Sequence, residues 1–142
     1  MSLTLSAAQT IIKKSLDHAR NADFKPLGVV VLDERGAVKT VAIEDGTNLK
    51  RYEIAYGKAH GAIALGVGSR ALYNHVSERP HFITAATHAI GGALIPVPGG
   101  VLIRDSNNAI IGAVGVAGET ADNDEKAAAL GIKAAGFVAD GG

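Results

Sequence analysis

The pattern of apolar and polar positions predicts an amphipathic helix near the start of the chain. Apolar residues recur close to the helical period between Leu5 and about Asn21, and charged residues such as Lys13 and Asp17 lie between them. Ser6 and Gln9 have the spacing of a capping box, which satisfies backbone N–H groups at a helix N-terminus. We therefore expect a helix that packs one face on a core.

Two pairs of apolar segments predict two β-hairpins. Residues 29–32 are apolar at every position, which is typical of a strand buried on both faces, and residues 37–43 follow after a turn. Residues 101–104 and 109–116 flank the turn-forming run Asp105–Asn108. We expect the strands of this second hairpin to lie centrally in the sheet.

Helical spacing returns in residues 49–65, in short segments between residues 69 and 90, and in an alanine-rich stretch from about 123 to 137. The last three residues, Asp140–Gly142, are expected to fray. The resulting order, α-β-β-α-α-β-β-α with hairpins, favours an α+β fold with an antiparallel sheet flanked by helices. A length of 142 residues fits a single domain spanning residues 1–142.

A proline–glycine corner, Pro96–Gly100, precedes the second hairpin and specifies a rigid turn. The hairpin's second strand runs into Gly118, after which Thr120 or Asp122 can cap the last helix. Backbone N–H groups of a turn and of a helix N-terminus would then lie together, an arrangement that binds anions. We expect a ligand to be held there.

Composition narrows the classes of function. Hydrophobic residues make up 47% of the chain, charged residues 20%, and the formal net charge is zero, so bulk charge does not favour nucleic acid. Cysteine is absent, which excludes thiolate chemistry, and no apolar run approaches a membrane span. We therefore expect a cytoplasmic protein without nucleic-acid or membrane partners. The abundance of alanine and glycine favours close packing between subunits.

Histidines are the main titratable residues that could act as metal ligands or as catalytic groups. None of them shows the spacing that places two zinc ligands on one helix face. A single histidine can still ligate haem iron, because this requires only a neutral imidazole nitrogen beside an apolar slot. The five histidines are His18, His60, His75, His81 and His88.

Three basic residues could hold a ligand carboxylate. Lys58 lies among small and apolar residues and could bind a carboxylate or act as an amine base. It could equally extend its ammonium group into water or pair with Glu53. Arg70 and Arg104 could clamp a carboxylate, although ordinary salt bridges are favoured for both, for example Arg104 with Asp105 or Glu119.

Several stretches together resemble the GlcG/HbpS haem-binding family, which includes the C-terminal domain of PduO-type proteins. The matching segments are Leu5–Gln9, Val31–Asp33, Ile54–Ala59, Gly66–Leu72, Pro96–Val101, Gly112–Gly118 and Asp124–Glu125. The resemblance implies a profilin-like fold, assembly into homo-oligomers such as dimers, tetramers or octamers, and haem as a cofactor. It also implies His18 as the axial iron ligand, with His60 as second choice.

The resulting hypothesis is a haem-binding protein in which Lys58 or Arg70 lies near the propionates. Pro98, Gly99 and Gly100 would shape the pocket wall. One alternative is an enzyme acting on a small aromatic or carboxylate-bearing compound, with Lys58 or His60 as the acid–base group. Another is an accessory subunit that assembles with itself or with a partner.

Overall fold

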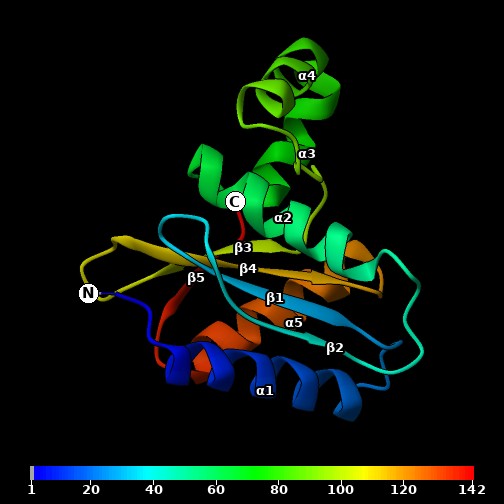
Figure 1. Ribbon diagram of the computed structural model, residues 1–142, viewed down its shortest axis with the longest axis vertical. Helices are drawn as coiled ribbons and strands as arrows, with labels where there is room; N and C mark the ends of the chain where they lie inside the picture. The colour runs from blue at the N-terminus through cyan, green and yellow to red at the C-terminus, as the bar shows by residue number, and fades with distance from the viewer. Residues whose placement is uncertain (1) are drawn as a thin grey trace.

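A computed structural model, which describes residues 2–142, has a five-stranded antiparallel sheet at its centre (Figure 1). The strand order is β2-β1-β4-β3-β5, so the second hairpin lies centrally, as predicted. The strands are β1 (Gly28–Asp33), β2 (Val38–Ile43), β3 (Gly100–Arg104), β4 (Ile110–Ala117) and β5 (Val138–Asp140).

Helices cover both faces of this sheet. Figure 1 shows α1 and α5 on one face and α2 on the other, with α3 and α4 projecting beyond α2. The helices are α1 (Leu5–Asn21), α2 (Arg51–Leu65), α3 (Ser69–Glu78), α4 (Pro80–Ala89) and α5 (Ala121–Ala134). The predicted α+β architecture is confirmed. None of the helices in residues 2–142 has the length and apolarity needed to cross a membrane.

Side chains of β4 alternate between two cores. Val114 and Val116 pack in the cluster that includes α1 and α5, whereas Ala113 and Ala117 pack in the cluster that includes α2. This period-two alternation is what a strand covered on both faces requires.

A cross-strand glycine pair lets α2 lie directly on the sheet. Gly100 of β3 is the register partner of Gly115 of β4. A Cβ atom at Gly100 would overlap the carbonyl group of Lys58, and one at Gly115 would overlap that of Ala55. The absence of side chains at these two positions therefore sets how closely α2, and with it Lys58, approaches the sheet.

The structure corrects three details of the sequence interpretation. Helix α1 is capped by Thr4, whose hydroxyl accepts from Ala7 N–H at 3.1 Å, and Ser6 lies inside the helix. The chain end is not frayed: β5 pairs with β3, and the Gly141 carbonyl accepts from Arg70 N–H at 3.1 Å. Residues 69–90 form two helices, in agreement with the short segments expected there, whereas the predicted element order counts this region as one helix. The element order therefore contains one more helix and one more strand than predicted.

Candidate functional site

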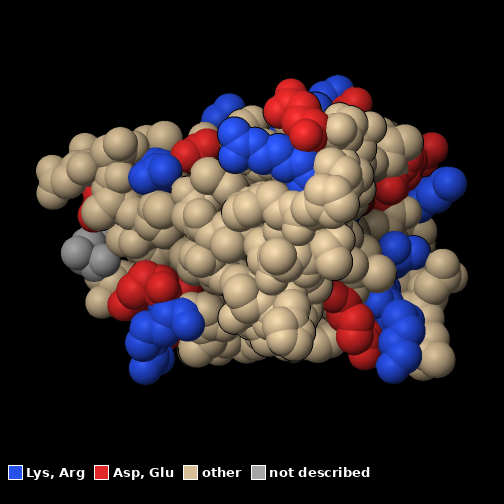
Figure 2. All heavy atoms as spheres, turned by 90° about the horizontal axis from the view of Figure 1, so that it is seen from above, with Lys and Arg blue, Asp and Glu red and all other residues tan. Residues whose placement is uncertain are grey.

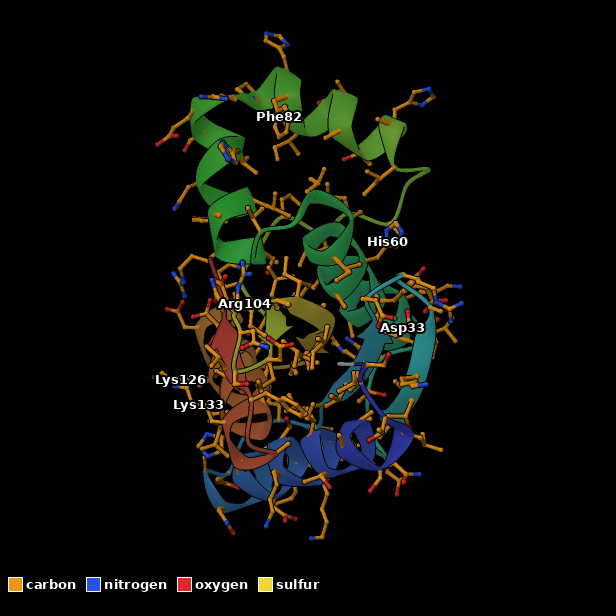
Figure 3. All side chains as sticks on the ribbon, turned by 90° about the vertical axis from the view of Figure 1, so that its left-hand side faces the viewer. Asp33, His60, Phe82, Arg104, Lys126 and Lys133 are labelled. Carbon is orange, nitrogen blue, oxygen red and sulfur yellow. The ribbon has the colours of Figure 1, made fainter. Side chains whose placement is uncertain are left out.

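An open depression of about 530 Å³ lies where α1 meets α5. Its lining residues are His18, Lys126, Ala129, Leu130, Lys133 and Ala134. Figure 3 shows Lys126 and Lys133 projecting from α5 toward the same side of the molecule. The floor between the lysines is made of alanine and leucine side chains. We call this feature the His18 depression.

Close packing of α1 on α5 places His18 at this position. The Ser15 hydroxyl donates to the Ala127 carbonyl at 2.9 Å, and both groups are buried. Gly131 faces α1 so closely that a Cβ atom there would overlap the Ser15 hydroxyl. His18 follows Ser15 by three residues, about one helical turn, so its ring emerges at the edge of the same helix contact.

The His18 imidazole is half-buried and packs edge-on against Phe24, with ring centroids 5.4 Å apart. None of the side-chain hydrogen bonds within residues 2–142 includes a ring nitrogen of His18. Phe24 is held in place by its backbone N–H, which donates to the Ala19 carbonyl at 2.9 Å. His18 therefore has a supported ring and nitrogens that are available to a ligand.

The lining of the His18 depression is apolar with basic ends. Leu130 is 40% exposed although it is a large apolar side chain. Lys126 and Lys133 are exposed, and the lining contains no carboxylate. Within residues 2–142 neither lysine takes part in an ion pair. The depression can accept a ligand with an apolar surface and negatively charged ends.

Lys58 lies elsewhere, in the interior. Its Nζ lies 2.9 Å from Asp124 Oδ2 and donates to the Val116 carbonyl at 3.0 Å. The ion pair is almost fully buried, with side-chain exposures of 4% for Lys58 and 2% for Asp124. Burial raises the pKa of Asp124, and the charge of Lys58 opposes this rise. Lys58 pairs with Asp124 and not with Glu53, which instead pairs with Lys50.

The proline–glycine corner packs on this buried pair. A Cβ atom at Gly99 would lie 2.8 Å from Lys58 Nζ, and one at Gly100 would overlap the Lys58 carbonyl. Both glycines are buried, and neither lines the His18 depression. Lys58, Gly99 and Gly100 thus form one packed unit inside the protein.

Arg70 and Pro98 do come together, in a second depression of about 330 Å³ beside the N-terminus of α5. There Arg70 lies 2.6 Å from Asp122 and 3.1 Å from Glu125, so it forms the ordinary salt bridges that were favoured for it. The hydrogen bonds that the Arg70 guanidinium donates to Glu125 and Asp122 raise its pKa. Two carboxylates against one guanidinium leave no excess positive charge for an anionic ligand.

The N-terminus of α5 is satisfied by the chain itself. The Thr120 hydroxyl accepts from Asn123 N–H at 3.2 Å, as expected of a cap. The Asp124 carboxylate accepts from Glu119 N–H at 2.9 Å. The backbone donor that was expected to bind a ligand carboxylate therefore binds the carboxylate of Asp124.

His60 lies on α2, on the other side of the sheet from the His18 depression (Figure 3). Its Nδ1 lies 2.9 Å from the Ala93 carbonyl, so Nδ1 carries the proton and Nε2 is the free nitrogen. The ring packs against Tyr56 with centroids 5.3 Å apart. His60 and Lys58 are two residues apart on a helix and so do not face each other.

Sequence reasoning missed Lys126, Leu130 and Lys133. Their spacing of four and three residues places them on one face of α5, and that signal was present in the sequence. The alanine-rich composition of this segment predicts a helix but does not by itself distinguish its exposed face from its buried face. The structure distinguishes the two faces because Ala127, Ala128 and their neighbours pack into the core.

The sequence matches the model of the family described as "Haem degrading protein HbpS-like" over residues 3–133. The chain belongs to this HbpS-like family. None of the curated proteins matches the chain significantly.

Solved structures share the fold over nearly the whole chain. A complex of PduOC with haem has a TM-score of 0.85 at 20% identity, covering 96% of this chain and 97% of that one. The ORFY protein of Klebsiella pneumoniae has a TM-score of 0.82 at 24% identity, covering 94% and 90%. HbpS has a TM-score of 0.80 at 25% identity, covering 94% and 89%.

Proposed function

We propose that this protein binds haem in the His18 depression, with the His18 imidazole as an axial ligand of the iron. The observation that carries the proposal is a half-buried imidazole, free of protein hydrogen bonds, beside an apolar surface. These are the two features that a histidine-ligated haem needs. Membership of the HbpS-like family and the haem complex of the PduOC structure support haem as the bound molecule.

The residues present fit this cofactor. When bound, haem supplies an iron centre for ligand exchange and redox chemistry. His18 would hold the iron, and Phe24 would keep the imidazole in its orientation through the edge-on contact. Leu130, Ala129 and Ala134 would cover one side of the porphyrin and keep water from it.

Titration of the purified apoprotein with hemin tests the proposal. We expect a Soret band that shifts in His18→Ala and is unchanged in His81→Ala, a matched change of an exposed histidine on α4. A spectrum that changes in His60→Ala but not in His18→Ala would indicate that His60, on α2, ligates the iron instead of His18. Identical spectra for both variants and the wild type would reject imidazole ligation by these residues.

We also propose that the protein assembles into homo-oligomers through the arm formed by α3 and α4. Helix α4 packs mainly on α3, and the arm stands away from the sheet (Figure 1). Tyr73, Val76 and Phe82 on the arm are 52%, 41% and 43% exposed. Figure 2 shows that the centre of the face seen from above carries few charged side chains. An apolar projection of this kind is typical of subunit contacts.

Native mass spectrometry of the purified protein tests this assembly. We expect more than one subunit for the wild type and a smaller assembly for Phe82→Glu. Leu49→Glu is the matched control, because Leu49 is 91% exposed and lies outside the arm. An unchanged subunit count in Phe82→Glu, or a monomeric wild type, would contradict the proposed interface.

A further inference from the structure

The charge around the His18 depression has one sign. Lys126 and Lys133 stand at its rim, and no aspartate or glutamate lines it. Neither lysine has a counterion within residues 2–142. Two solvated ammonium groups therefore face the depression without a protein partner.

The two lysines bracket the apolar floor. They are seven residues apart on α5, which corresponds to about 10.5 Å along a helix, and they lie on the same face. Ala129 and Leu130 lie between them, and His18 comes to the same depression from α1. A flat apolar ligand that rests on Leu130 would thus have an ammonium group near each end.

We propose that Lys126 and Lys133 bind the carboxylates of a flat, apolar dicarboxylate held in the His18 depression. This inference rests on the proposed function, under which these carboxylates are the two haem propionates. It assigns to α5 the role that the sequence suggested for Lys58 or Arg70. Those two cations are neutralised by Asp124 and by Asp122 and Glu125, whereas the two lysines of α5 have free charge.

Metal-free protoporphyrin IX and its dimethyl ester separate carboxylate binding from iron ligation. The ester keeps the flat apolar ring but has no charge. We expect the wild type to bind the free acid more tightly than the ester, by about two- to fivefold for each lysine, as exposed ion pairs contribute. Added salt should reduce this preference, because it screens exposed charges.

The variants are Lys126→Gln, Lys133→Gln and the double change, measured by fluorescence titration. We expect the preference for the acid to fall in each single variant and to disappear in the double variant. Lys50→Gln is the matched control: it removes an exposed lysine next to α2, on the other face of the sheet. That variant should keep the wild-type preference.

Two results would overturn the inference: equal affinity of the wild type for acid and ester, or an unchanged preference in the double variant. Failure of the proposed function is distinguishable from either result. If His18→Ala leaves the hemin spectrum unchanged while the lysine variants lose the preference for the acid, the depression binds a dicarboxylate without ligating iron through His18. If His18→Ala alters the hemin spectrum and the lysine variants change nothing, only the lysine assignment is wrong.

Discussion

The ammonium group of Lys58 lies 2.9 Å from the carboxylate of Asp124, and this contact joins helices on opposite faces of the sheet. Lys58 comes from α2 and Asp124 from the first turn of α5. They meet at the end of β4, where Lys58 also donates to the Val116 carbonyl. Asp124 in turn accepts from Glu119 N–H, so one buried carboxylate orders both the lysine and the turn before α5.

Removal of one partner of this pair should destabilise the fold strongly. Lys58→Met leaves the Asp124 carboxylate buried without a cation, and we expect the free energy of unfolding to fall by about 3–5 kcal/mol. Urea denaturation monitored by circular dichroism measures it. The control is Lys50→Met, which breaks an exposed pair with Glu53 and should cost about 0.5 kcal/mol or less.

A double replacement separates the cost of an unpaired buried charge from the cost of lost contacts of the Lys58 side chain. In Lys58→Met with Asp124→Leu, no uncompensated charge remains, and buried ion pairs replaced by apolar residues are often neutral in stability. We expect the double variant to regain part of the stability lost in Lys58→Met. A double variant less stable than Lys58→Met would show that Asp124 stabilises the fold through packing and the Glu119 hydrogen bond by more than its unpaired charge costs.

The stability of Lys58→Met should depend on pH in a defined direction. Burial raises the pKa of Asp124 above its ordinary value of 3.8, and removal of Lys58 takes away the main effect that lowers it. A carboxyl group whose pKa is higher in the folded state binds a proton more tightly there, so stability falls as pH rises through the window between the unfolded and folded pKa values. The deficit of the variant is therefore largest above the folded pKa and shrinks as pH falls toward 3.8.

Unfolding free energies of wild type and Lys58→Met at about pH 7 and about pH 5 check this sign. A smaller difference between the two proteins at the lower pH agrees with it. A difference that grows toward low pH would mean that the folded-state pKa of Asp124 is lower in the variant than in the wild type.

Local patterns predicted most of the fold. The two hairpins and the main helices follow from apolar periodicity. Each element buries one face, and the spacing of apolar residues within that segment identifies the element. The strand β5 was missed because three residues, Val138–Asp140, carry too short a pattern. Its formation depends on pairing with β3, which is distant in the sequence.

The residues of the candidate site could be predicted only in part, for the same reason. His18 was chosen from a family resemblance, and the structure gives it an apolar depression made by α5. The partners of charged residues were not predictable: Lys58 pairs with Asp124, 66 positions away, and Arg104 pairs with Asp140 rather than with Asp105. Sequence neighbours are natural first guesses, but burial brings together charges that are distant along the chain.

The glycine pair beneath α2 predicts that the packing of α2 on the sheet and the Lys58–Asp124 ion pair depend on each other. A Cβ atom at Gly115 would overlap the Ala55 carbonyl, so Gly115→Ala should push α2 from the sheet and destabilise the protein by about 1–3 kcal/mol. Because Lys58 is carried by α2, its pair with Asp124 should weaken too. The effects of Gly115→Ala and Lys58→Met on stability should therefore be less than additive.

Gly112→Ala is the matched control for this double-mutant cycle. Gly112 lies on the same strand, but its Cβ atom would meet the Leu32 carbonyl and Leu3, on the α1 side. Its effect should add to that of Lys58→Met within about 0.5 kcal/mol. Additivity for Gly115→Ala as well would show that the lysine pair does not depend on how closely α2 approaches the sheet.

The exposed leucine in the His18 depression should matter for ligand binding and not for folding. Leu130 is 40% exposed, so Leu130→Ser should change the unfolding free energy by about 0.5 kcal/mol or less. A porphyrin that covers this side chain would lose apolar contact worth about 1 kcal/mol, or about fivefold in affinity. Val38→Ser, at a residue that is 48% exposed on β2, is the control and should leave hemin affinity unchanged. Equal hemin affinity of Leu130→Ser and wild type would place the ligand away from α5, because a porphyrin at His18 cannot avoid the side chain that forms the floor beside it.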